Sequence, residues 1–234
     1  MRGIYHRQVL QRALGAQVSA RALAAITRAN LNQDNLSGLV GHPEYHFDDG
    51  LFAESLKYIE DQRALAAQAA WPAKAWAAFG RLSHAAQDFY SHSNYVALWM
   101  EQGLPSPVNH PERSEAKSKD PDRALRGAKD WGWPPVTSID GLDPALLKHP
   151  RLRSGRVYWP VEALWILPPF RPLVKRLVPK DSHAWMNLDS PAAGPLFPYS
   201  IEAAVQRTLA EFERTLAAIG EERGEEAVKA SRDM

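Results

Sequence analysis

The sequence contains no cysteine. Any metal site in this chain must therefore use nitrogen and oxygen ligands, because thiolate ligands are excluded. The same absence excludes disulfide bonds, which are common in exported domains, and a thiol nucleophile. The sequence also has no phosphate-binding glycine loop and no GxSxG element, so it lacks the common signatures of nucleotide binding and of serine hydrolases.

Long apolar runs and an excess of charge are also absent. No apolar run is long enough to predict a transmembrane helix, and the start, MRGIYHRQVLQRALG, lacks the apolar core of a signal peptide. We therefore expect a cytoplasmic protein. The net charge is +1, with 28 basic and 27 acidic residues, so bulk charge gives no reason to expect binding to nucleic acid or to an acidic membrane.

The spacing of apolar residues predicts an all-α fold. Segments rich in alanine and leucine predict four core helices, at about residues 6–29, 51–70, 73–101 and 199–222. Gly15 is a weak point within the first of these. The whole chain of 234 residues fits one helical domain with a large insertion.

The insertion, residues 102–198, is rich in proline. It holds 16 of the 18 prolines, which disfavours long helices, and it shows no alternating strand pattern. It also contains many aromatic residues, unlike a disordered linker, so we expect ordered loops and short helices, with a mobile part at 105–128. Within it, VYWPVEALWILPPF (157–170) has two interpretations: loop anchors buried in the core, or an interfacial patch that contacts lipid.

The stretch FGRLSHAAQDFYSHSNYV, residues 79–96, carries the strongest signal of a site. In a helix, its residues His84, Asp88 and His92 fall within about 80° of one another. Two imidazoles and a carboxylate on one helical stripe predict part of a first shell for a divalent metal, most naturally zinc. The alternative is a buried polar seam satisfied by hydrogen bonds.

Three other segments carry potential ligands. His6 begins the first predicted helix, where a histidine is more often a surface or capping residue. The turn-rich loop 30–50 is either a metal-binding loop or an ordinary polar surface loop. Its main potential ligands are Asp34, His46 and Asp48. The segment DSHAWMNLDSP (181–191) adds a weaker group: His183, Asn187 and Asp189.

The stretch GRLSHAAQDFYSHSNYV resembles the signature of the Het-C-like proteins. More distantly, the chain resembles the superfamily of zinc-dependent phospholipases C and single-strand-specific nucleases. The resemblance covers residues 1–100 and follows an ordered pattern: His6, Asp34, His46 opening HFDDG, His84, Asp88 and His92. It implies an all-helical core of the phospholipase C type that holds one to three zinc ions.

Three departures limit what the resemblance carries over. Met1 is not the tryptophan that begins the mature phospholipases and binds one zinc. The gap from Asp88 to His92 is shorter than is usual in the phospholipases. Their later His-xxx-Glu pair has no clean match, and its best substitute is His183 with Asn187 or Asp189.

The resemblance further implies a metal-dependent phosphoric-ester hydrolase of phospholipase C type, in which water activated by the metals attacks phosphorus. Asp34, or failing that Asp48, would orient or deprotonate this water, and Asp88 would bridge two metals. The expected partner is a phosphoester substrate such as a phospholipid, with peripheral membrane contact. Two alternatives stay open: a non-catalytic Het-C-like module in which structural zinc supports binding to a partner or membrane, and a single-strand nuclease, which the neutral charge disfavours.

Overall fold

The computed structural model describes residues 1–103 and 133–233, and this part of the chain is built from helices. Among these residues the β-structure is limited to two isolated bridge pairs, Ser93 with Ser154 and Arg156 with Ser182. The predicted all-α class is therefore confirmed. The mobile part expected at 105–128 lies outside the described residues.

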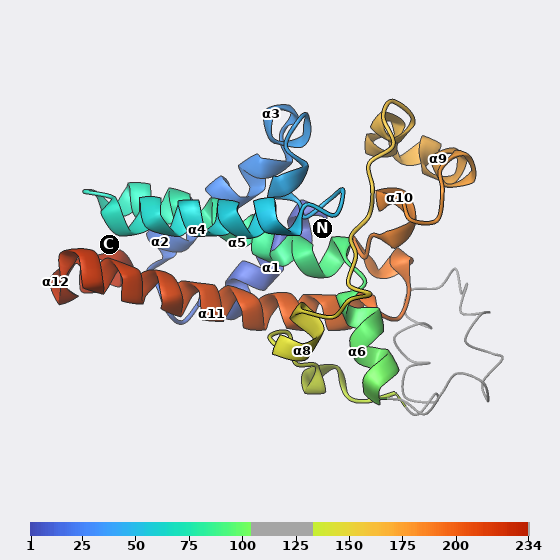
Figure 1. Cartoon of the computed structure of the whole chain (residues 1–234). Helices are drawn as coiled ribbons and strands as arrows, with labels where there is room; N and C mark the ends of the chain where they lie inside the picture. Colours follow the sequence, from blue (N-terminus) through green and yellow to red (C-terminus); the bar gives the residue numbers. More distant parts are fainter. Residues whose placement is uncertain (104–132, 234) are drawn as a thin grey trace.

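Helix α5 (Pro72–His92) is the centre of the fold. It packs against α2 (Ala20–Leu31), α4 (Phe52–Gln68) and α11 (Phe197–Arg223), while α1 (Gly3–Leu14) contacts α2 and α11 (Figure 1). Every residue of α5 from Leu82 to its end is buried. Polar side chains in this half of α5 therefore need partners inside the protein, because an unpaired buried polar group is costly.

Helix α2 approaches α5 closely at Gly80. A Cβ atom at this position would lie 2.4 Å from the carbonyl oxygen of Ile26 and 2.7 Å from the Cβ of Ala29, so a larger residue does not fit without a shift. The close approach places the last turn of α2 against the polar part of α5. There Asn30 Nδ2 donates a hydrogen bond of 3.0 Å to Ser83 Oγ.

The prediction of one helix over 6–29 is wrong, because the chain forms α1 and α2 with a turn at residues 15–19. Helix α1 ends at the weak point expected from the sequence, where Gly15 N donates to Gln11 O at 3.0 Å. Ser19 then caps α2 by accepting a hydrogen bond of 3.2 Å from Ala22 N.

The predicted helix 73–101 also divides, into α5 and α6 (Tyr95–Gly103). Ser93 has an extended backbone, with φ −108° and ψ 168°, which ends α5. The other two predictions agree with the structure to within a few residues: 51–70 corresponds to α4 and 199–222 to α11, which α12 (Glu225–Asp233) follows.

The described part of the proline-rich region consists of loops and short helices. These are η5 (Val136–Ser138), α8 (Pro144–Leu147), η6 (Val161–Ile166), η7 (Pro168–Phe170), α9 (Arg171–Leu177), α10 (His183–Met186) and η8 (Pro191–Ala193). Two backbone hydrogen bonds fasten this region to the end of α5: Gly155 N to His92 O at 3.0 Å, and Leu188 N to Ser91 O at 2.7 Å. They bring residues 181–191 beside His92.

Within the described residues, no helix combines the length and the hydrophobicity that a membrane-spanning segment requires.

Candidate metal site

Asp88 lies at the centre of a group of buried imidazoles, and its own side chain is fully buried. Its Oδ2 atom lies 3.0 Å from both His84 Nε2 and His46 Nδ1, and these two nitrogens are 3.1 Å apart. If both nitrogens carry protons, each can donate to Asp88 Oδ2, but the two N–H groups then crowd each other, whereas one cation at the centre contacts all three atoms. Ligand atoms around a tetrahedral zinc, with bonds of about 2.0–2.1 Å, lie about 3.3 Å from one another, which is close to this arrangement.

His6 faces the other oxygen of the same carboxylate. Its Nε2 lies 3.2 Å from Asp88 Oδ1, yet this buried nitrogen has no hydrogen-bond partner among the described residues. Its Nδ1 donates a hydrogen bond of 2.6 Å to Gln87 Oε1, since an amide oxygen only accepts. In the neutral ring the lone pair is therefore on Nε2, next to a carboxylate oxygen that also carries lone pairs. A cation between the two atoms would satisfy both.

Gln87 is itself held in one orientation. Its Nε2 donates to Thr208 Oγ1 at 3.1 Å, and Asn30 Nδ2 donates to Gln87 Oε1 at 3.3 Å. The amide oxygen must therefore point to His6. Sequence analysis missed both Gln87 and Asn30. The available signal was a glutamine directly before Asp88 within a helix of otherwise mainly apolar character.

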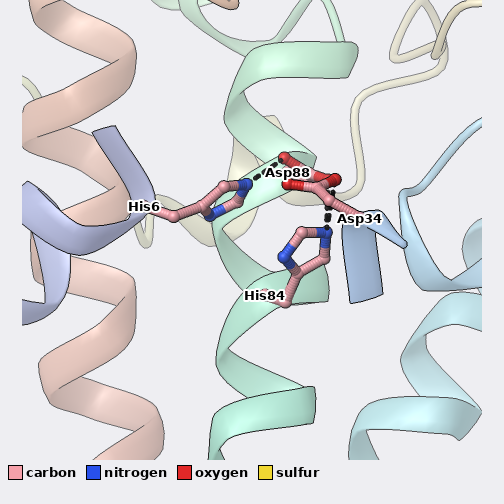
Figure 2. Close-up of side chains that lie close together, drawn as sticks. All are labelled: His6, Asp34, His84 and Asp88. Atoms are coloured by element: carbon pink, nitrogen blue, oxygen red, sulfur yellow. Dashed lines mark ion pairs between the residues drawn. The ribbon is translucent and has the colours of Figure 1, made fainter. Parts of the chain in front are cut away.

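Asp34, at the end of η1 (Asn32–Asp34), completes a group of four. One ligand atom from each of His6, Asp34, His84 and Asp88 lies within 4.8 Å of the others, and we call these residues the α5 cluster. Figure 2 shows His6 from α1 and Asp34 from η1 reaching the two α5 residues from either side. Asp34 Oδ1 is 3.6 Å from His84 Nε2, and its side chain is the most exposed of the four.

A second cluster consists of Asp48, His92 and His183, whose ligand atoms also lie within 4.8 Å of one another. His183 Nδ1 lies 2.9 Å from Asp48 Oδ1. His92 Nδ1 lies 3.4 Å from the same oxygen and donates a hydrogen bond of 2.9 Å to the carbonyl oxygen of His46. Asp189 adjoins this cluster, with Oδ1 3.2 Å from His92 Nε2. The amino group of Met1 lies between the clusters, 2.6 Å from Asp88 Oδ1 and 3.1 Å from Asp189 Oδ1, so the region between these carboxylates already stabilises a positive charge.

The backbone around Asp48 is in an unusual conformation. Phe47 and Asp49 have φ values of 55° and 58°, in the left-handed region that residues other than glycine seldom adopt. The buried ring of Phe47 packs against Phe52 and Phe89, at centroid distances of 6.0 Å and 5.2 Å. This packing holds the loop in a conformation that places the Asp48 carboxylate between two histidines.

Burial and charge change the ionisation of the clusters. Burial opposes ionisation of Asp88, but the amino group of Met1 and His92 outweigh it and hold the pKa of this carboxyl well below its usual value. Burial lowers the pKa of His84 to about 4, so its imidazole is neutral at pH 7. Burial also opposes protonation of His46, but its hydrogen bond to Asp88 and the charge of Asp88 raise the pKa above the usual value. The ionised Asp88 and the neutral His84 are therefore in the protonation states that zinc requires, whereas a protonated His46 must lose its proton before it can bind the ion.

The structure places every histidine and aspartate that was predicted as a ligand in or beside these clusters. The α5 cluster contains His6, Asp34, His84 and Asp88, the second cluster contains Asp48, His92 and His183, and His46 and Asp189 lie against them. Asn187 does not join them, because its side chain donates to the carbonyl oxygen of His183. His6, His46 and Asp48 are buried, which excludes the surface alternatives for these three residues. Metal binding itself stays a prediction.

A family model described as the VWA7 N-terminal domain matches residues 5–121, which is half of the chain. The matched range includes the whole α5 cluster, together with His46, Asp48 and His92. Proteins named von Willebrand factor A domain-containing protein 7 are similar to the chain over 87 residues, with 37% identity for the rat protein and 36% for those of mouse and human. These alignments cover 36% of this chain and only about a tenth of the length of each relative. No solved structure matches the chain.

These comparisons correct the predicted identity. The matching family is not the Het-C-like family or the phospholipase C and single-strand nuclease superfamily, so that resemblance is wrong. The phosphoric-ester hydrolase activity falls with it, and so do the two alternatives of a Het-C-like module and a nuclease. The water-activating roles of Asp34 and Asp48 were part of that hypothesis, and no finding tests them. The physical reason is that His-xxx-Asp-xxx-His spacing places three polar side chains on one face of a helix. Helices in unrelated families can use this arrangement to bind a metal, so the spacing does not identify the family or the reaction. The chain belongs to the VWA7 N-terminal domain family.

Proposed function

We propose that this domain binds divalent metal, with zinc as the preferred ion, at the α5 cluster and at the adjoining second cluster. The ligand set is nitrogen and oxygen with several imidazoles, which favours zinc over magnesium or calcium. Two clusters support two metal positions, within the one to three expected from the sequence.

One observation carries the proposal. Asp88 Oδ2, His46 Nδ1 and His84 Nε2 lie 3.0–3.1 Å from one another in a buried position. In neutral His84, a proton on Nδ1 leaves Nε2 and Asp88 Oδ2 facing each other as acceptors, and a proton on Nε2 leaves the buried Nδ1 without a partner among the described residues. Neither neutral form satisfies the whole ring. On the other side of the carboxylate, His6 Nε2 faces Asp88 Oδ1 without a hydrogen-bond partner among the described residues, so these two atoms also lack a proton or a cation between them.

The role that this geometry supports is the joining of distant segments. The ligands come from α1, η1, the loop before α4, the end of α5 and the start of α10. Zinc bound to them would stabilise the fold by its binding free energy, because the unfolded chain holds no preformed site. The expected function is therefore a metal-stabilised module within a longer protein such as the relatives, rather than a catalyst.

The test is the metal content of the purified full chain. We expect about two zinc ions per chain by elemental mass spectrometry after reloading and desalting. His84→Ala should reduce this number and lower the melting temperature of the loaded protein. His149→Ala is the matched control, because His149 lies outside both clusters and its Nδ1 accepts a hydrogen bond from Arg151 N. Wild-type protein that holds no metal, with its fold intact, would reject the proposal.

A second candidate function is contact with an anionic membrane surface, and we also propose it on the basis of a separate observation. Residues 159–185 expose large apolar side chains, including Trp159 (54%), Leu177 (61%) and Trp185 (41%). Lys175 Nζ lies 5.6 Å and 5.2 Å from the ring centres of Trp165 and Trp185. Exposed tryptophan and leucine beside basic groups are typical of interfacial segments. Helix α9, which carries Leu177 and Lys175, lies at one end of the molecule (Figure 1).

Vesicle flotation tests this second candidate. The full chain should float with vesicles that contain phosphatidylserine, and less with vesicles of phosphatidylcholine alone. Leu177→Asp should weaken the binding, whereas Leu65→Asp, at another exposed leucine on α4, should not. Equal binding by the two variants, or no binding by wild type, would contradict membrane contact through α9.

A further inference from the structure

A pocket of about 480 Å³ opens beside the two clusters. One wall comes from residues 36–43, with Leu36, Leu39 and Val40, and the facing wall comes from residues 157–165, with Trp159 and Trp165. The side chains of both walls are predominantly apolar. A pocket of this size falls within the range of small-molecule sites, which is about 300–1,000 Å³.

The polar side of the pocket is formed by proposed metal ligands. His46, Asp48 and His183 all line it, so the pocket leads from solvent to the second cluster and to the edge of the α5 cluster. A ligand in the pocket could therefore reach a metal held by these residues through one end, while its other end lies between the apolar walls.

The other acidic side chains in the lining already have partners. Glu162 accepts hydrogen bonds from Tyr158 N at 2.5 Å and from Ala184 N at 2.7 Å. Asp49 accepts one from Val157 N at 2.6 Å. These carboxylates stabilise the backbone of the pocket wall, so the strongest remaining attraction for a polar group is the metal.

We propose that this pocket binds an amphiphilic anion, with a carboxylate or phosphate head group on the metal and a single apolar chain between the two walls. The inference rests on the proposed function, because the head group needs the metal. Without a cation, an anionic head group would face the carboxylate of Asp48 and be repelled. With a cation, it would add an oxygen ligand to a position that Asp48 and His183 leave incomplete.

The apolar walls predict a dependence on chain length. Burial of one methylene contributes about 0.8 kcal/mol, which corresponds to about a fourfold gain in affinity. Decanoate, with two more methylenes than octanoate, should therefore bind about fifteenfold more tightly while the pocket still has room.

Isothermal titration calorimetry of the zinc-loaded full chain tests this proposal. Decanoate should bind, whereas acetate, which lacks the chain, and decanol, which lacks the charge, should each bind more than about tenfold less tightly. Decyl phosphate in a parallel titration shows which head group is preferred. Removal of zinc by a chelator should abolish the binding of decanoate.

Two pocket variants complete the experiment. Ala163→Trp should fill the space between the walls and weaken decanoate binding at least tenfold with unchanged zinc content, whereas Ala217→Trp, at an exposed position on α11, should not. Leu39→Glu, at a half-exposed position on the pocket wall, gives a second test that does not depend on the fit of a large side chain. Fully loaded protein that binds neither decanoate nor decyl phosphate, or variants that bind as wild type does, would overturn the pocket proposal alone. Failure to load zinc would instead overturn the proposed function.

Discussion

His6 Nδ1 donates a hydrogen bond of 2.6 Å to Gln87 Oε1, and this contact directs the other ring nitrogen of His6 to Asp88. The two residues are far apart in the sequence, yet the orientation of Gln87 determines which nitrogen of His6 carries the proton. Gln87 fixes which nitrogen of His6 keeps its lone pair, and so it decides whether His6 can bind a cation at all.

Gln87→Leu should therefore weaken zinc binding by about 10–100-fold, the usual effect of losing an outer-shell partner of a histidine ligand. Competition with a chromophoric chelator measures the affinity. Gln206→Leu is the control, because Gln206 bonds to Gly141 N and Ile139 O away from both clusters. It should lower stability without changing zinc affinity. Equal zinc affinities for wild type and Gln87→Leu would remove His6 from the ligand set.

The stabilisation that zinc gives should increase as the pH rises from 6.5 to 8. In the metal-free protein, acidic neighbours overcome burial and raise the pKa values of His46 and His92, so their protons stabilise the fold below pH 6.5. That stabilisation is lost as the pH rises through the folded-state pKa values. Zinc binds only the unprotonated rings, so its affinity increases as the rising pH removes these protons. His84, with a pKa of about 4, is neutral throughout this range.

Melting temperatures with zinc and with chelator, measured across this pH range, provide the test. The gap between the two curves should widen with pH. A gap that stays constant or narrows would show that His46 and His92 do not exchange protons for metal.

Gly80→Ala should destabilise the protein, because the added methyl group would lie 2.4 Å from the carbonyl oxygen of Ile26 where α2 crosses α5. The same change at Gly220 in α11 is the matched control. Its added methyl group meets only the side chain of Val228, at 3.3 Å, and the flexible end of Glu225. Alanine is favoured over glycine in a helix by about 1 kcal/mol, so Gly220→Ala should leave stability unchanged or raise it. Thermal unfolding distinguishes the two, and a stable Gly80→Ala protein would contradict the close packing of α2 on α5.

Glu211→Leu should cost about 3–5 kcal/mol of unfolding free energy, because it leaves the buried guanidinium group of Arg207 without its counter-ion. Glu211 Oε1 lies 2.6 Å from Arg207 Nε, and its Oε2 lies 2.5 Å from Arg63 Nη2, which links α11 to α4. Glu213→Leu, two residues away on the exposed side of α11, should change stability by less than about 0.5 kcal/mol. Denaturant unfolding measures both changes. Similar losses in the two variants would mean that the buried network contributes little.

The sequence was sufficient to predict the helices with clear apolar periodicity. Helices α4 and α11 have boundaries close to those expected, since no internal residue interrupts their pattern. The break after α5 was not predicted, and the break after α1 was expected only as a weak point at Gly15 within one helix. The cap at Ser19 and the extended backbone at Ser93 depend on hydrogen bonds and packing that local periodicity does not report.

The part of the site that lies on one helix could be predicted from the sequence. His84, Asp88 and His92 share a stripe of α5, so helical spacing alone brought them together. The convergence of His183 depends on the backbone hydrogen bonds from Gly155 N to His92 O and from Leu188 N to Ser91 O, which join residues 63 and 97 positions apart in the sequence. Gln87 could not be singled out, because its role depends on Thr208 and Asn30 in two other helices. The family was mispredicted because ligand spacing reports local geometry rather than descent.

The central claim is that buried metal joins α1, η1 and α5 at Asp88. Anomalous scattering at the zinc edge, from a crystal of the zinc-loaded full chain, tests it most directly. We predict a peak about 2.0–2.2 Å from both His84 Nε2 and an oxygen of Asp88. An anomalous map without a peak between these side chains, in crystals whose histidines occupy the positions described here, would contradict the claim.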